Sequence, residues 1–276
     1  MLVFLIASGL SLIFGVLGVI NMAHGSLYML GAYLSYTVVG MISENLAPFW
    51  IAVLIVPVLI GLLGGAIEVT LLRGMVKREV LYQLLLTYGL VLVFNDAAKF
   101  IWGTDNLSVT RPASMVGSVA ILGSKFPTYY FLILVIAPLV ALGLWLMLHK
   151  TQMGKIIRAA TLDREMVGAW GINVKRIFTL VFILGSGLGG LGGALTAPMS
   201  AIAPGMDVEV LIESFIVVVI GGLGSLGGSL LGAIILGQLN AFGILVVPRL
   251  AMVFTFVLMA IVLIVRPWGL LGRKPG

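Results

Sequence analysis

Long apolar runs, separated by short polar or glycine-rich interruptions, fill almost the whole chain. A transmembrane helix needs about 20 apolar residues, because an α-helix rises about 1.5 Å per residue and the hydrocarbon core is about 30 Å thick. The runs show too little alternation for membrane-spanning strands. The pattern predicts an all-α fold, a polytopic transmembrane helical bundle of about eight to nine hydrophobic segments with Gly-rich breaks. The segments are 2–20, 26–42, 50–72, 80–101, 129–148, 177–196, 208–222, 229–247 and 250–266.

The composition supports this assignment. Of 276 residues, 61% are hydrophobic and 9% are charged, whereas a soluble domain carries about 25% charged residues. The net charge is +6, but the basic residues gather at segment ends, which favours a topology signal over nucleic-acid binding. The first run is longer than a signal-peptide core and lacks a basic leading region, so we expect it to be retained. No cysteine is present, which excludes disulfides and thiol catalysis.

Three basic regions indicate the orientation in the bilayer. They are residues 73–78, residues 150–176 and the end of the chain, and if all segments cross the membrane they share one side. Lysine and arginine are enriched on the cytoplasmic side, so this side and the C-terminus are expected to be cytoplasmic. The basic residues of the first and last regions are Arg73, Lys77, Arg78, Arg266, Arg273 and Lys274.

Residues 150–176 form the one long charged interval of the sequence. Two interpretations are open: a solvated loop that only fixes orientation, or a docking helix for a water-soluble partner. Apolar residues recur here at three- and four-residue steps, as on one face of a short helix. They are Met153, Ile156, Ile157, Ala160, Val167 and Trp170. The charged residues are Lys150, Lys155, Arg158, Asp163, Arg164, Glu165, Lys175 and Arg176.

Three stretches interrupt the apolar pattern: residues 21–25, with the sequence Asn-Met-Ala-His-Gly, and the glycine-rich runs 185–193 and 221–228. Small residues let helix backbones approach closely, and they also allow helices to unwind. Tight packing is one interpretation. The other is a set of broken helices that line a solute path, since irregular backbone at depth is tolerated only beside protein or water.

Polar side chains within the segments are functional candidates, because ionisable groups are costly in hydrocarbon. Glu68 lies near one end of its segment and is expected to reach the interface, and Asp207 is placed just outside the seventh segment. Asp96 and Lys99 lie three residues apart and can neutralise each other. His24 either bonds a backbone carbonyl or has a solute or gating role. The candidate translocation path comprises Asn21, His24, Gly25, Asn95, Glu213, Gly222 and Gly224.

Several motifs are absent. The sequence has no G-x-x-x-x-G-K-[ST] loop, so this chain does not hydrolyse ATP by that route. It has neither H-E-x-x-H nor G-x-S-x-G, and no clustered metal ligands. We therefore expect no enzyme, no cofactor and no metal site. Two classes remain: a permease driven by a partner's ATP hydrolysis, and an ion-coupled secondary carrier acting alone, for which Asp96 or Glu213 would serve.

Three stretches carry a family resemblance. Residues 9–33, which include Ile20-Asn-Met-Ala-His-Gly25, resemble the amino-terminal signature of branched-chain amino acid ABC transporter permeases of the LivH type. Residues 158–174 resemble the cytoplasmic coupling segment of that family, and residues 220–233 are similar to its glycine-rich carboxy-terminal signature. Together the likeness covers nearly the whole chain, and the combination of motifs is specific to this family.

The resemblance implies one transmembrane permease domain over residues 1–276, with a coupling segment at about 150–176. The chain would form half of the pore in the bacterial inner membrane. Its partners would be a second permease, identical or different, two ATP-binding subunits and a periplasmic solute-binding protein. The solutes would be branched-chain amino acids, or, as in related permeases, urea, short amides or other amino acids. Coupling to the ATP-binding subunit would involve Arg158, Ala159, Ala160, Asp163, Arg164, Gly168 and Gly171.

Overall fold

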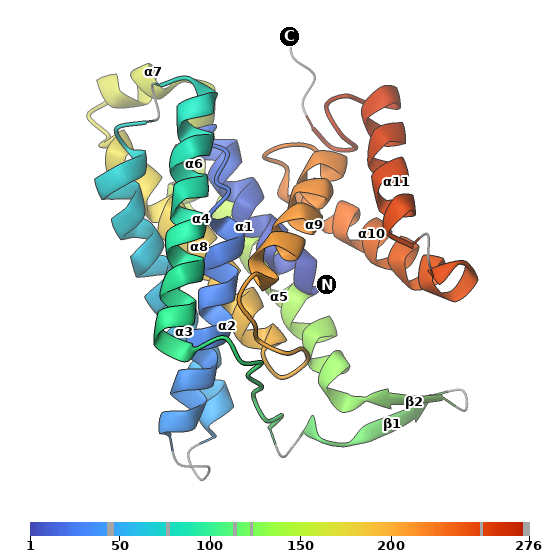
Figure 1. Ribbon diagram of the computed structural model, residues 1–276. Helices are drawn as coiled ribbons and strands as arrows, with labels where there is room; N and C mark the ends of the chain where they lie inside the picture. The colour runs from blue at the N-terminus through green and yellow to red at the C-terminus, as the bar shows by residue number, and fades with distance from the viewer. Residues whose placement is uncertain (43–46, 76–77, 113–114, 122–123, 249–250, 273–276) are drawn as a thin grey trace.

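The computed structural model describes residues 1–42, 47–75, 78–112, 115–121, 124–248 and 251–272. Within them the chain is almost wholly helical, which confirms the all-α bundle (Figure 1). The predicted basic residues Lys77, Arg273 and Lys274 lie outside the described residues. The first half contains α1 (Leu2–Leu17), α2 (His24–Met41), α3 (Pro48–Ile67), the π-helix η2 (Glu68–Leu72), α4 (Val80–Trp102) and α5 (Thr128–Lys150).

The second half begins with two short helices and continues with four longer ones. They are α6 (Gln152–Leu162), α7 (Arg164–Ala169), α8 (Val174–Thr196), α9 (Met206–Gly221), α10 (Leu226–Val246) and α11 (Ala251–Val265). One antiparallel hairpin of β1 (Ser118–Ile121) and β2 (Ser124–Pro127) precedes α5, with Val119 paired to Phe126. The apolar pattern predicted no element between the fourth and fifth segments, where the hairpin lies. The hairpin projects from one end of the bundle (Figure 1).

The predicted count of membrane-crossing segments is too high. Among the described residues, five helical stretches are long and apolar enough to cross a membrane. Three of the missing segments are too short, because α1 and α9 have 16 residues each and α11 has 15. The fourth, α2, has 18 residues but does not qualify by its hydropathy. The five are Pro48–Leu72, Val80–Trp102, Thr128–Lys150, Val174–Thr196 and Leu226–Val246.

The glycine-rich helix α8 lies at the centre and packs against α1, α2 and α3. It stays helical throughout its glycine run, so tight packing is the correct interpretation at this place. A Cβ on Gly190 would lie 2.7 Å from the Cβ of Ile60, and one on Gly31 would lie 2.6 Å from the Gly190 carbonyl oxygen. Such contacts leave no room for a side chain, so the glycines set the distance between these helices.

Between α1 and α2 the backbone is non-helical inside the bundle. Gly18 ends α1 with φ 67°, in the left-handed region that favours glycine. The chain then turns back along α1, and His24 Nε2 lies 3.0 Å from the Ile6 carbonyl oxygen. Helix α2 therefore starts level with Ile6, about 16 Å from the far end of α1 at 1.5 Å per residue. The helical run is therefore broken here inside the bundle, and whether the break lines a solute path stays a prediction.

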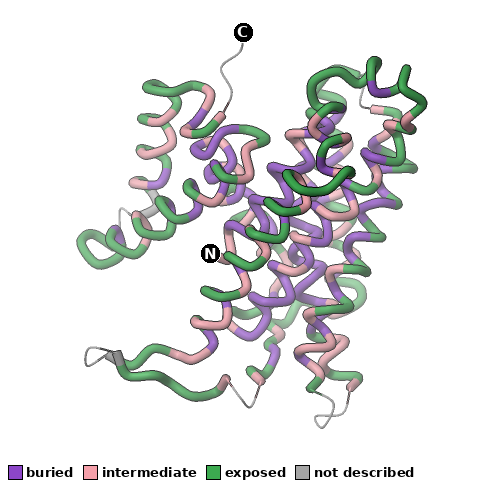
Figure 2. The backbone as a smooth tube through the Cα atoms, turned by 180° about the vertical axis from the view of Figure 1, so that it is seen from behind, coloured by how far each residue is buried: buried purple, intermediate pink, exposed green. Residues whose placement is uncertain are grey.

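Burial is concentrated on the inner helices, and the outer helices present apolar side chains. Figure 2 shows buried residues through the middle of the bundle and exposed ones along the arm of α10 and α11. Exposed side chains such as Leu85 on α4, Leu134 on α5 and Ile264 on α11 are apolar. An outer surface of this kind is suited to lipid, as expected of a multi-pass membrane protein.

The described parts of the three basic regions lie at one end of the bundle. Arg164 on α7 donates to the last carbonyls of α1, and Arg73 donates to Thr179 near the start of α8. The segment after α11 joins the end of α9, where Leu270 N donates to the Ile220 carbonyl. Figure 1 shows this common end, at the top of the view. We call it the basic end.

Candidate functional site

The charged interval folds into two short helices at the basic end, each with a side-chain cap. Thr151 Oγ1 accepts a hydrogen bond from Gly154 N at the start of α6. Asp163 Oδ1 accepts from the backbone N–H groups of Glu165 and Met166, both at 2.9 Å, at the start of α7. Such caps satisfy the free N–H groups of a helix's first turn. The interval is therefore an ordered helical segment, which we call the coupling segment.

One face of the coupling segment packs on the bundle. Ile157, Ala160 and Val167 are buried, as the apolar spacing predicts. Trp170 departs from that face, because its side chain is 80% exposed. Leu162 and Met166, which the sequence analysis missed, are exposed as well. Leu162 ends α6, whereas Met166 and Trp170 lie four residues apart on α7 and at its end. We call these three exposed apolar residues the apolar ridge.

The residues predicted to couple to an ATP-binding subunit divide into two groups. The Arg158 guanidinium donates to the Leu148 carbonyl at the end of α5, and Ala160 is buried, so both face the bundle. The exposed members are Ala159, Asp163, Arg164, Gly168 and Gly171.

Arg164 ties the coupling segment to α1. Its Nη2 lies 2.8 Å from the Leu17 carbonyl oxygen and 3.3 Å from that of Val16, and its guanidinium lies 5.0 Å from the Phe178 ring. The last carbonyls of a helix have no intrahelical partners and carry partial negative charge, which a guanidinium satisfies. A displacement of α7 would therefore act directly on the end of α1, next to the break before α2.

A second link joins α3 to α8 through Glu68, which is fully buried rather than at the interface as expected. Arg73 donates from Nε to Oε1 at 3.1 Å and from Nη2 to Oε2 at 2.9 Å. The Thr179 hydroxyl donates to the same carboxylate at 2.7 Å. The prediction failed because the carboxylate has Arg73 and Thr179 as hydrogen-bond partners against the bundle.

Loss of the Glu68 charge is expected to destabilise the protein. Glu68→Gln removes one side of a buried, forked ion pair, and since Arg73 is one-third exposed the expected loss is about 1–3 kcal/mol. Thermal unfolding in detergent measures it. The control is Asp96→Asn, since the predicted Asp96–Lys99 pair is present at 3.0 Å but exposed; its loss should cost no more than about 0.5 kcal/mol. Equal melting temperatures for the two variants would contradict this role.

A polar centre lies where α2, α4 and α9 meet. The Asp207 carboxylate is 1% exposed, and its Oδ2 accepts from Ser26 Oγ at 2.6 Å and from Asn95 Nδ2 at 2.8 Å. The sequence analysis placed Asp207 outside its segment and did not name Ser26. The error arises because α9, like α2, begins inside the bundle. We call Ser26, Asn95 and Asp207 the polar centre.

Three further path candidates lie at or beside this centre. The Asn21 side chain accepts from Ala23 N at 3.1 Å and shapes the turn into α2. His24 bonds a backbone carbonyl, the first of its two predicted roles. Gly25 packs against the backbone of Asp207. The structure thus brings Asn21, His24, Gly25 and Asn95 into one region.

The remaining path candidates lie on α9 and in the turn that follows it. Glu213 is half-buried within α9, within electrostatic reach of Tyr28. Gly222 and Gly224 form the break between α9 and α10 at the basic end, with φ 104° and 80°. Gly224 packs against Gly15, and Gly222 against Gly272. This break is a closely packed turn at the end of the bundle and does not reach the polar centre.

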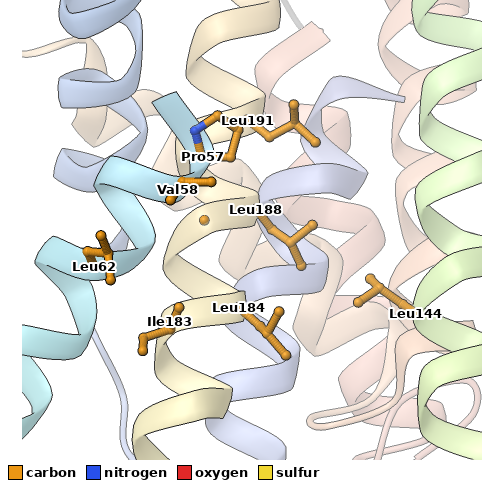
Figure 3. A pocket seen from close by; sticks show the side chains of 9 residues that line it. Pro57, Val58, Leu62, Leu144, Ile183, Leu184, Leu188 and Leu191 are labelled. Carbon is orange, nitrogen blue, oxygen red and sulfur yellow. The ribbon is translucent and has the colours of Figure 1, made fainter. Parts of the chain in front are cut away.

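An apolar groove lies on the outer side between α3, α5 and α8 (Figure 3). Its volume is about 310 Å³, and Leu144 faces Leu184 and Leu188 across it. The described residues that line it are all apolar or glycine. No group of three or more potential metal ligands occurs among the described residues.

Curated relatives match nearly the whole chain. It is 30% identical over 279 residues to the high-affinity branched-chain amino acid transport system permease protein BraD of Pseudomonas aeruginosa, and 27% identical to LivH of Escherichia coli K12. Each match covers 98% of this chain and 91% of the relative. The ribose import permease protein RbsC of Escherichia coli is 28% identical over 86% of this chain and 72% of its own length.

No solved structure shows a significant match to the chain. A family model described as the permease component of the branched-chain amino acid transport system matches residues 1–263. Its match includes the helix break, the coupling segment and the polar centre. The chain therefore belongs to the family of branched-chain amino acid transport system permease components.

Proposed function

We propose that this chain is the membrane-spanning permease subunit of an ABC importer for branched-chain amino acids. The observation that carries the proposal is the family match over residues 1–263. A capped, partly exposed helical segment at the basic end is consistent with a subunit driven by a soluble partner. Because a ribose import permease is also similar to this chain, similarity alone does not fix the class of solute.

The proposed assembly contains this chain, a second permease of the same or another kind, two ATP-binding subunits and a periplasmic solute-binding protein. The location is the bacterial inner membrane. The clustering of basic residues supports a cytoplasmic basic end and C-terminus. The whole chain then acts as one transmembrane domain, whose coupling segment at about 150–176 faces the ATP-binding subunits.

In the proposed mechanism the coupling segment transmits movement into the bundle. The apolar ridge and the exposed Ala159, Asp163, Gly168 and Gly171 provide the surface for the ATP-binding subunit. Arg158 and Arg164 pass the motion to α5 and α1. Closure of the ATP-binding subunits on nucleotide would then shift α1 against α2 and change the access of the path from one side to the other.

Trp170→Ala is expected to weaken binding of the ATP-binding subunit about 30-fold. A large exposed aromatic ring in an interface commonly contributes about 2 kcal/mol, which corresponds to that factor. The measurement is titration of the purified permease pair with the purified ATP-binding subunit. The control is Phe100→Ala, since Phe100 is 92% exposed but lies at the end of α4 away from the basic end. If Trp170→Ala binds the ATP-binding subunit with unchanged affinity, the apolar ridge is not part of the interface.

The solute assignment can be tested in proteoliposomes that contain the complete importer. Uptake of labelled leucine, isoleucine or valine, which unlabelled leucine inhibits and ribose or urea does not, would support the proposal. Uptake of ribose or urea in preference to leucine would assign the chain to another solute within the same family.

A further inference from the structure

Asp207 is a buried carboxylate in the bundle without a cationic partner among the described residues. The ion pairs found there join Arg73 to Glu68 and Lys99 to Asp96. Ser26 and Asn95 both donate to Oδ2, whereas Oδ1 is buried and has no hydrogen-bond partner in the described part of the chain. An unpaired ionisable group within a membrane costs free energy. A buried carboxylate such as Asp207 is therefore a candidate for binding a ligand.

This carboxylate lies inside the bundle, away from the basic end. Ser26 is in the first turn of α2, which starts level with Ile6. Asp207 is at the start of α9, about 21 Å from the Gly221 end at 1.5 Å per residue. The hydrocarbon core is about 30 Å thick. The amino termini of α2 and α9 meet here, and their dipoles favour a negative charge.

The arrangement of donors suits one chemical class of ligand. Two neutral donors fix Oδ2 and leave Oδ1 as a free, oriented acceptor with a negative charge. A primary ammonium has three donors and a positive charge, and would form a charge-assisted hydrogen bond with it. A sugar or urea brings no positive charge to such a site.

We propose that Asp207 Oδ1, oriented by Ser26 and Asn95, binds the α-ammonium group of the amino acid as it passes between α2 and α9. The inference rests on the proposed function and deepens it, because it selects zwitterionic solutes over neutral ones. In this structure Gly25 packs against the Asp207 backbone, so the site is closed. Separation of α2 from α9 during the transport cycle exposes it.

Asp207→Asn tests this role, because the amide keeps the shape and loses the charge. In proteoliposomes with the complete importer, leucine moved per ATP hydrolysed is expected to fall at least about tenfold. Subunit assembly and the ATPase activity stimulated by the loaded binding protein should stay near the wild-type values. Ser26→Ala and Asn95→Ala each remove one donor that orients the carboxylate but keep its charge, so each is expected to lower the ratio by only about threefold, less than Asp207→Asn does. A wild-type coupling ratio for Asp207→Asn would overturn the proposal.

A labelling experiment decides the case in which Asp207→Asn fails to assemble. The chain contains no cysteine, so Ser26→Cys places a single thiol beside the carboxylate. During ATP turnover, leucine should slow its reaction with a water-soluble maleimide, and isocaproate, which lacks the ammonium group, should not. Equal or absent protection by the two would overturn the ammonium site. If the wild-type importer moves no amino acid, the proposed function is wrong. That result can be distinguished from a failure of the ammonium site, in which the wild-type importer still moves leucine.

Discussion

Leucine in place of Gly222 is expected to reduce ATP-driven uptake by more than about tenfold, with most of the loss from defective folding. Gly222 has φ 104° and ψ 124°, a conformation that disfavours a side chain by about 1–3 kcal/mol. A Cβ there would lie 2.6 Å from the Cα of Gly272 and 2.8 Å from the Trp268 carbonyl oxygen. Overpacking of this kind costs about 1–3 kcal/mol more. Thermal unfolding and uptake with the reconstituted complex measure both effects.

The matched control is Gly237→Leu on α10. A Cβ on Gly237 meets nothing within 4 Å, and the residue is exposed. This variant should therefore assemble and transport close to the wild-type level. If Gly222→Leu also transports at that level, close packing of the turn between α9 and α10 is not required for function.

Charge reversal at Arg164 is expected to uncouple ATP hydrolysis from transport. Arg164→Glu replaces a donor to the Val16 and Leu17 carbonyls by an acidic group, which the negative end of the α1 dipole repels. Stimulation of ATPase activity by the loaded binding protein should fall about tenfold or more, since the link to α1 is lost. Binding of the ATP-binding subunit should change little, because the Arg164 guanidinium faces the bundle.

Lys155→Glu is the control for Arg164→Glu. Lys155 is exposed on α6, in the same segment, so its reversal changes the net charge equally without touching α1. If the loaded binding protein still stimulates the ATPase activity of Arg164→Glu fully, the proposed link between Arg164 and α1 is contradicted. Loss of the ATP-binding subunit from that variant would instead place Arg164 in the docking surface.

The pattern of apolar and small residues correctly predicted the positions of the helices and their closely packed faces. Apolar runs located the helices, because the rise per residue and the bilayer thickness fix their length. The spacing of Ile157, Ala160 and Val167 identified the buried face of the coupling segment. The glycine run of α8 indicated close packing, which the contact of Gly190 with Ile60 confirms.

The predictions for Asp207 and Glu68 were wrong because they depend on how the helices are placed in the bundle. Asp207 was placed just outside the seventh segment because a linear reading assumes that each segment crosses completely, whereas α9 starts inside the bundle. Glu68 was expected at the interface because it lies near one end of its apolar run, whereas its bond to Thr179 depends on the packing of α3 against α8. Ser26 joined the site only through a contact between residues 181 positions apart. Such pairings follow from tertiary structure, which a single-chain pattern does not encode.

Leucine uptake by the reconstituted complex, measured with ATP and with ion gradients in turn, tests the central claim most directly. The account predicts uptake that requires the ATP-binding subunits, the loaded binding protein and hydrolysable ATP. It also predicts that ionophores leave this uptake unchanged. If the purified chain, without partners, accumulated leucine on an imposed proton or sodium gradient, it would be a secondary carrier and the account would be contradicted.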